Sequence, residues 1–91
     1  MKYSIVVTSR FRKEQKQMKK RGAHLDKLKS VIGMLADGSV LPAQYRDHEL
    51  TGNFKGYREC HISPDWLLIY RIFEDKLILT LERTGTHSDL F

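Results

Sequence analysis

The chain has 91 residues, and we expect residues 1–91 to form one domain because this length is too short for two. A hydrophobic content of 41% excludes a disordered tail, and the lack of a long apolar stretch excludes both a signal peptide and a membrane span. The net charge of +5 predicts a polyanionic partner, such as a nucleic acid or an acidic protein.

Residues 3–7 (YSIVV) are predicted to form a short strand, because β-branched and aromatic side chains favour extended structure. Residues 9–21 and 23–36 should form two helices, the first of them capped by Thr8 or Ser9. The connection between the helices is very short, so they should pack as an antiparallel hairpin. The positions at helical spacing that should face the core are Phe11, Gln15 and Met18 in the first helix and Leu25, Leu28, Ile32 and Leu35 in the second.

The second half of the sequence is typical of strands. Residues 37–47 should be a loop, because a DGS run and a proline interrupt the helical pattern. Three strands should follow, at residues 56–62, 66–73 and 76–86, and residues 87–91 should form a tail or a single helical turn. The strand at 66–73 (WLLIYRIF) is apolar on both faces, which predicts a central position in the sheet.

This order of elements predicts an α+β fold. The N-terminal strand and the two-helix antiparallel hairpin should pack on a mainly antiparallel sheet of four to five strands. We place residues 3–7 at an edge of this sheet, beside the last strand.

Three histidines and one aspartate lie in polar contexts of the strand-rich half: His48, His61, Asp65 and His87. Histidine is the only side chain whose ordinary pKa lies near neutral pH, so it can both take and give a proton there. Cleavage of RNA needs a base for the 2′-hydroxyl proton, an acid for the departing 5′-oxygen, and positive charge near the phosphoryl oxygens. Because His61 and Asp65 flank one turn, these groups can converge, and RNA cleavage is our hypothesis.

A structural role is the common alternative for a single histidine, and we assign it to His24 on the second predicted helix. A zinc site is the rival functional interpretation, since three histidines and an aspartate could ligate a metal. Zinc ligands usually include pairs at short spacing, such as HExxH or CxxC, and no such pair is present. We therefore expect no metal and no other cofactor.

Other residues permit two interpretations each. Trp66 either packs in the core or offers a surface on which a base can stack. Glu59 and Arg83 are equally consistent with surface ion pairs and with proton-transfer or phosphate-binding groups. Phe91, at the end of the sequence, could cap the site or stack on a nucleobase. The basic residues of the first helix are usually a solvated face, although the net charge lets them grip a phosphate backbone.

Three motifs give the sequence a family resemblance. They are L-x-G-x-x-K-G-x-R from Leu50, H-I-x-P-D-W from His61 and R-T-G-T-H-S-x-L-F from Arg83. With them, essentially the whole chain resembles the YafQ group of the RelE/ParE toxin superfamily, which are bacterial type II toxin–antitoxin ribonucleases. The resemblance implies a microbial-ribonuclease-like sheet with two N-terminal helices.

The resemblance also implies roles for individual residues. The active-site pattern falls on His48, His61, Asp65 and His87, and Phe91 is also implicated. His87 is then the general acid or base nearest the scissile phosphate, and Asp65 is its proton-transfer partner. His48 and His61 are transition-state stabilisers or alternate proton carriers. Glu59 stands where some relatives carry aspartate. The candidate substrate-binding residues are Glu59, Trp66, Arg83, Lys55 and Arg58.

The function implied by the resemblance is metal-independent cleavage of messenger RNA on the ribosome, which stops translation and growth. The implied partners are an acidic antitoxin, the 70S ribosome and its message, with operator DNA bound only through the antitoxin complex. Because Cys60 is the only cysteine and cannot form an internal disulfide, we expect the reducing cytoplasm and no membrane contact. Two alternatives stay open: a ParE-like inhibitor of DNA gyrase without enzymatic activity, and an antitoxin-binding subunit without catalysis.

Overall fold

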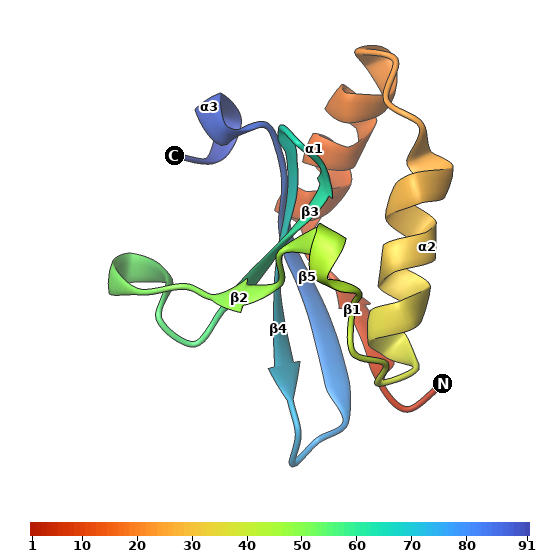
Figure 1. Ribbon diagram of the computed structural model, residues 1–91, viewed down its shortest axis with the longest axis vertical. Helices are drawn as coiled ribbons and strands as arrows, with labels where there is room; N and C mark the ends of the chain where they lie inside the picture. Colours follow the sequence, from red (N-terminus) through yellow and green to blue (C-terminus); the bar gives the residue numbers. More distant parts are fainter.

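The computed structural model describes residues 1–91 and contains one five-stranded sheet with the strand order β1-β5-β4-β3-β2. In Figure 1 the strands separate helices α1 and α2, on one side, from α3 and the β2–β3 connection on the other. The elements in chain order are β1 (Ser4–Val7), α1 (Ser9–Lys20), α2 (Leu25–Ala36), η1 (Ala43–Tyr45), β2 (His48–Glu49), η2 (Gly52–Phe54), β3 (Arg58–Ser63), β4 (Trp66–Phe73), β5 (Ile78–Gly85) and α3 (His87–Leu90).

The sheet confirms the predicted α+β architecture. Strand β1 lies at an edge beside β5, as predicted, and pairs with it in parallel, while the other neighbouring strands pair antiparallel. Strand β4 lies in the centre of the sheet. The short strand β2 was not predicted, since two residues are too few to show an alternating pattern.

The helices begin and end close to the predicted positions. The Thr8 hydroxyl caps α1 by accepting a hydrogen bond of 3.0 Å from the Phe11 backbone N–H. The expected start of the second helix at Ala23 is wrong by two residues: α2 begins at Leu25, and His24 precedes it as an N-cap without a side-chain bond. The loop expected at 37–47 contains the short 3-10 helix η1.

The core lies on both faces of the sheet. A main cluster joins α1 and α2 to the face that carries Cys60, Leu68 and Tyr70, and a smaller cluster on the other face joins Leu67 and Ile69 to Leu90 of α3. Since β4 supplies buried residues to both clusters, the predicted two-sided apolar character of this strand is confirmed.

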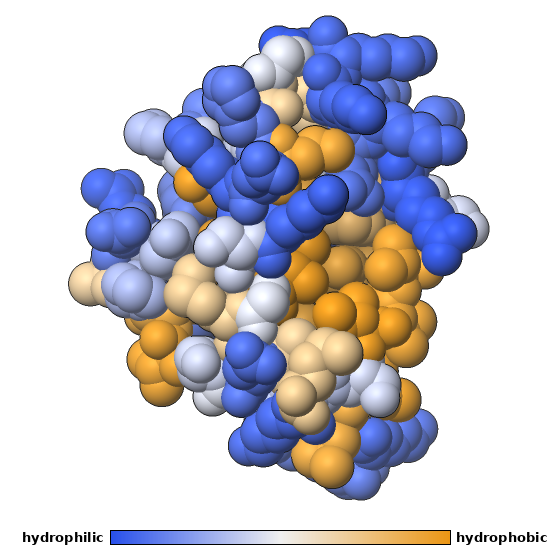
Figure 2. Space-filling view, turned by 90° about the vertical axis from the view of Figure 1, so that its right-hand side faces the viewer, coloured by the Kyte–Doolittle hydropathy of each residue, from blue (hydrophilic) through white to orange (hydrophobic).

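The hydropathy of the surface changes along the helical hairpin. Figure 2 views the molecule from the side of α2 and shows hydrophilic residues around the turn between α1 and α2, with apolar atoms exposed below them. Lys19 and Lys20 are exposed in the last turn of α1, next to this connection. None of the helices has the length and apolarity needed to cross a bilayer.

Candidate active site

The sheet face opposite the helices carries a buried carboxylate between two imidazoles. Along β3, Cys60 and Ile62 pack under the helices, so Glu59 and His61 lie on the other face, as their alternation predicts. His48 on β2 is the cross-strand partner of Glu59. The Glu59 Oε1 atom lies 3.5 Å from His61 Nε2 and 3.8 Å from His48 Nε2.

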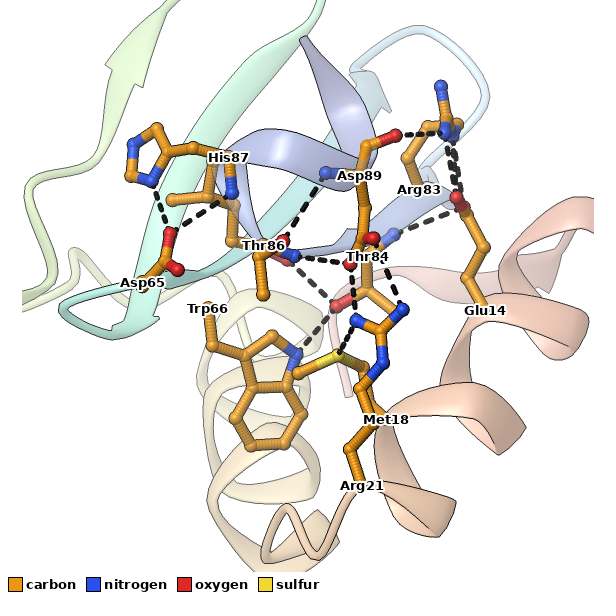
Figure 3. A network of polar contacts seen from close by, with 11 residues as sticks. Glu14, Met18, Arg21, Asp65, Trp66, Arg83, Thr84, Thr86, His87 and Asp89 are labelled. Atoms are coloured by element: carbon orange, nitrogen blue, oxygen red, sulfur yellow. Dashed lines mark hydrogen bonds and ion pairs between the residues drawn. The ribbon is translucent and has the colours of Figure 1, made fainter.

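The third histidine reaches the same place from α3. His87 begins this helix, and its ring centroid lies 5.7 Å from that of His61. Its Nδ1 atom lies 2.7 Å from Asp65 Oδ1, and its backbone N–H donates to the same oxygen at 3.1 Å (Figure 3). These hydrogen bonds lower the pKa of Asp65, so this group is a carboxylate at neutral pH.

The hydrogen bonds also define which ring nitrogens carry protons. A carboxylate can only accept, so His87 Nδ1 donates to Asp65 and Nε2 is left for a proton transfer. A backbone carbonyl likewise only accepts, so His48 Nδ1 donates to the Arg46 carbonyl oxygen at 2.7 Å. His48 and His61 thus lie beside Glu59, and His87 lies near both Glu59 and His61. The tautomers of His48 and His87 are set by the oxygen atoms to which their Nδ1 atoms donate.

The same groups have the spacing of a small metal site. Glu59, His61 and His87 each offer one ligand atom, and these atoms lie within 4.8 Å of one another. The bond from His87 to Asp65 resembles the carboxylate–histidine pairs that orient metal-binding imidazoles. The donor set therefore fits a transition metal as well as it fits proton transfer.

Helix α3, which carries His87, is attached to the helical hairpin. Thr86 and Asp89 form a capping box at its start. The Asp89 carboxylate accepts hydrogen bonds of 2.6 and 3.2 Å from the Arg21 guanidinium at the end of α1 (Figure 3). The side chain of Leu90 is buried against Leu67 and Ile69. These contacts fix the position of His87 over the sheet.

An exposed aromatic pair lies beside α3. Phe91 is 62% exposed, and its ring packs edge-on against Phe54 at a centroid distance of 5.7 Å. Sequence reasoning did not select Phe54, because an aromatic residue in a loop gives no local signal of this long-range contact.

Four predicted substrate-binding residues are not part of the histidine cluster. Trp66 is buried at 4% exposure, where its indole N–H donates to Thr84, so its placement favours core packing over base stacking. Arg83 and Arg58 form ion pairs with Glu14 and Asp47, which favours the ion-pair interpretation of Arg83. Lys55 is exposed between η2 and β3.

The buried thiol of Cys60 is not a nucleophile for this site. It lies on the helix-covered face, and burial raises its pKa to about 12. Because the thiolate is the nucleophilic form, the chemistry of the site rests on imidazoles and carboxylates.

Comparison with known proteins gives full-length matches. A family model described as a bacterial toxin of type II toxin–antitoxin systems, YafQ, matches residues 3–91. The mRNA interferase toxin YafQ of Escherichia coli strain K12 is 46% identical over 88 residues, which are 96% of this chain and 94% of that protein.

Two solved structures are similar in fold and sequence. The crystal structure of the E. coli DinJ-YafQ complex contains a chain that is 41% identical, with a TM-score of 0.90 and coverage of 98% of both chains. A metal-bound toxin from Helicobacter pylori is 42% identical, with a TM-score of 0.91 and coverage of 98% of this chain and 99% of that one.

Proposed function

This chain belongs to the YafQ family of bacterial toxins of type II toxin–antitoxin systems, and from that premise we propose that it is an endoribonuclease that cuts messenger RNA. The E. coli relative is named an mRNA interferase toxin, and it has been crystallised with DinJ. We propose that residues 1–91 act as one domain, in the cytoplasm, and that an antitoxin of acidic character covers the site. Operator DNA is contacted through the antitoxin.

The observation that supports this proposal is the convergence of Glu59, His48, His61 and His87 on one sheet face. Cleavage begins when a base takes the 2′-hydroxyl proton and the 2′-oxygen attacks phosphorus. It ends when an acid gives a proton to the departing 5′-oxygen, which leaves a cyclic phosphate and a free 5′-hydroxyl. Imidazoles with ordinary pKa values near neutrality can perform both transfers.

The geometry supports a division of roles. His87 holds one nitrogen on Asp65 and presents the other, so we assign it the proton transfer at the scissile phosphate. Asp65 stays ionised and orients His87, because its pKa is lowered by this bond. Glu59 with His61 forms the second proton-transfer pair, and His48 adds positive charge when protonated.

We propose that catalysis needs no metal, although the cluster has metal-binding spacing. The two proton transfers and the charge stabilisation are all supplied by side chains of the chain itself. A metal on Glu59, His61 and His87 would occupy the lone pairs that these transfers use. We therefore assign the metal-bound form to an inactive state.

We further propose that the ribosome presents the message. The net charge of +5 and the basic end of α1 favour ribosomal RNA as a partner through long-range attraction and counterion release. The ribosome then supplies substrate orientation to a site in which His48 and His87 are about half exposed.

The test compares three chains after brief induction in cells: the wild-type, His87→Gln and Lys29→Gln. Lys29 is a matched control because it is exposed on α2 and lines none of the clefts beside the histidine cluster. The proposal expects growth arrest and cut messages for the wild-type and Lys29→Gln, and neither for His87→Gln.

The other outcomes identify the alternatives. Growth arrest by all three chains with intact messages would replace the proposal by a gyrase inhibitor. Absence of arrest by the wild-type would leave an antitoxin-binding subunit without catalysis.

A further inference from the structure

We infer that a basic groove between α2, η1 and the end of β3 binds the RNA strand next to the scissile phosphate, with Lys27 and Arg46 contacting its phosphates. This inference rests on the proposed RNA cleavage and adds a substrate-binding surface outside the histidine cluster.

The groove is continuous with the candidate active site. A cleft of about 360 Å³ is lined by Lys27, Tyr45, Arg46 and Ser63 together with His61, which belongs to the histidine cluster. A second cleft of about 440 Å³ shares Lys27 and Tyr45 with the first, so the two form one channel along α2. A strand that leaves His61 can therefore continue past these side chains.

Lys27 occupies the junction of this channel. It lines a third cleft as well, which contains Asp65, the hydrogen-bond partner of His87. A single ammonium group is thus within reach of strands that leave the site on either side of His61 and Asp65. Two carboxylates lie along the clefts, Asp26 at the far end and Asp65 in the site.

The absence of an ion pair distinguishes Lys27 and Arg46 from several other cations of the chain. The guanidinium groups of Arg21, Arg58 and Arg83 each form an ion pair with a carboxylate of the chain. Lys27 and Arg46 form none within 4.0 Å, so their charges are free for an external anion. Phosphate diesters are the anions that the adjacent chemistry requires.

The backbone of Arg46 adds an independent observation. Arg46 is a non-glycine residue with φ of +48°, a conformation that side chains rarely adopt. This conformation directs its carbonyl oxygen to His48 Nδ1, at 2.7 Å. Arg46 therefore links the groove directly to a histidine of the cluster, and Tyr45 beside it offers a ring on which a base can stack.

The experiment measures binding of fluorescein-labelled single-stranded RNA at several salt concentrations. The full chain carries His87→Gln so that the RNA stays intact. Lys27→Ala and Arg46→Asn remove the charges, and asparagine tolerates positive φ. Lys27→Arg keeps the charge, and Lys29→Ala is the matched control because Lys29 is exposed on the same helix and lines none of the three clefts. Thermal unfolding verifies that each variant folds.

We expect Lys27→Ala and Arg46→Asn to weaken binding by about threefold or more and to reduce the slope of log affinity against log salt by about 0.7 each. Lys27→Arg and Lys29→Ala should retain the wild-type slope. Equal slopes for Lys27→Ala and Lys29→Ala overturn the inference. If Lys27→Ala leaves RNA binding unchanged and weakens the antitoxin complex, the groove is an antitoxin site and the inference is wrong.

The proposed function is tested separately in the same preparation. The chain with His87 restored is added to ribosomes that carry a message. Cleavage that is equal for the Lys27 and Lys29 variants contradicts the groove alone, whereas absence of cleavage by the wild-type contradicts the proposed function.

Discussion

Glu59 has the most unusual surroundings of any carboxylate in the chain. It is only 5% exposed, yet it has no lysine or arginine partner, and the groups near its charge are the imidazoles of His48 and His61. A buried carboxylate in this setting is stabilised when a neighbouring imidazole is protonated. Glu59 and His61 therefore lie close enough to act together as a general acid and base pair.

Replacing this carboxylate tests its role directly. We expect Glu59→Gln to lower kcat/KM for RNA cleavage by about 10²- to 10⁴-fold, because the amide keeps the shape and loses the proton-transfer group. Glu49→Gln is the control, since Glu49 is on the same short strand β2 as His48 and its side chain is 82% exposed. Equal rates for the two variants, measured with ribosome-bound message, would remove Glu59 from the mechanism.

Helix α3 is an element that cannot be stable by itself. A helix of four residues is far below the length at which helices persist in water, so tertiary contacts hold it in place. Those contacts are the capping box, the buried Leu90 and the bond from Asp89 to Arg21, which is 68 residues away in sequence. The position of His87 thus depends on the end of α1.

The bond between Asp89 and Arg21 should give α3 a dependence on pH. Hydrogen bonds from Arg21 and from Thr86 lower the pKa of Asp89 in the folded chain. In the unfolded chain this carboxyl titrates near the ordinary value of about 3.9, so the stabilisation is present above that pH and is lost as the pH falls toward the folded pKa. Because the pair is exposed to solvent, which screens its charges, its contribution to stability is small.

The unfolding midpoints of the wild-type and Asp89→Asn should therefore differ at pH 7, and this difference should shrink progressively as the pH falls below about 4. Asp75→Asn is the control, because Asp75 is exposed in the β4–β5 turn and forms no ion pair. A difference that stays constant from pH 7 to pH 2 would show that the carboxylate charge of Asp89 does not hold α3.

The elements differ in how far the sequence predicts them. The alternating apolar pattern of β3 and the two-sided apolar run of β4 predicted both strands and the face on which Glu59 and His61 lie. Strand β2 has only two residues, so no local pattern reveals it.

The roles of the charged residues were less predictable than the strands. Nothing in the sequence distinguishes a paired cation from an unpaired one. In the fold, Arg83 forms an ion pair with Glu14 from α1, whereas Lys27 lines a cleft without such a partner. Which carboxylate neutralises which cation depends on contacts between distant segments, and a single sequence does not encode these contacts in any local pattern.

At the scale of the whole molecule, the two faces of the sheet have different roles. The helices bury one face and provide most of the core, while the other face carries the histidine cluster above a small apolar layer that includes Leu67 and Ile69. Groups from β2, β3 and α3 thus meet over a rigid base. A metal ion bound by Glu59 and His61 of β3 and by His87 of α3 would change the stability of the fold as well as the cleavage rate.

Two measurements test whether catalysis is independent of metal and whether a bound metal stabilises the fold. Protein treated with EDTA and assayed with metal supplied only as the magnesium of the ribosome should retain its cleavage rate. Zinc should inhibit cleavage, and it should raise the unfolding midpoint because it binds the folded state alone, through Glu59, His61 and His87. The zinc-dependent rise in the unfolding midpoint should weaken in His61→Gln. Loss of cleavage after EDTA that only zinc restores would contradict metal-free catalysis.

The parallel pairing of β1 with β5 determines when, during its own synthesis, the toxin can complete its fold. Ser4 pairs with Ile78, so the first strand to be synthesised has no partner until the last strand, β5, has been made. His87 and Asp89 are translated later still. A nascent chain therefore has no assembled site until these residues have been translated. A product interrupted by a premature stop before residue 78 lacks β5 and His87, so we expect it to cause no growth arrest in cells without an antitoxin.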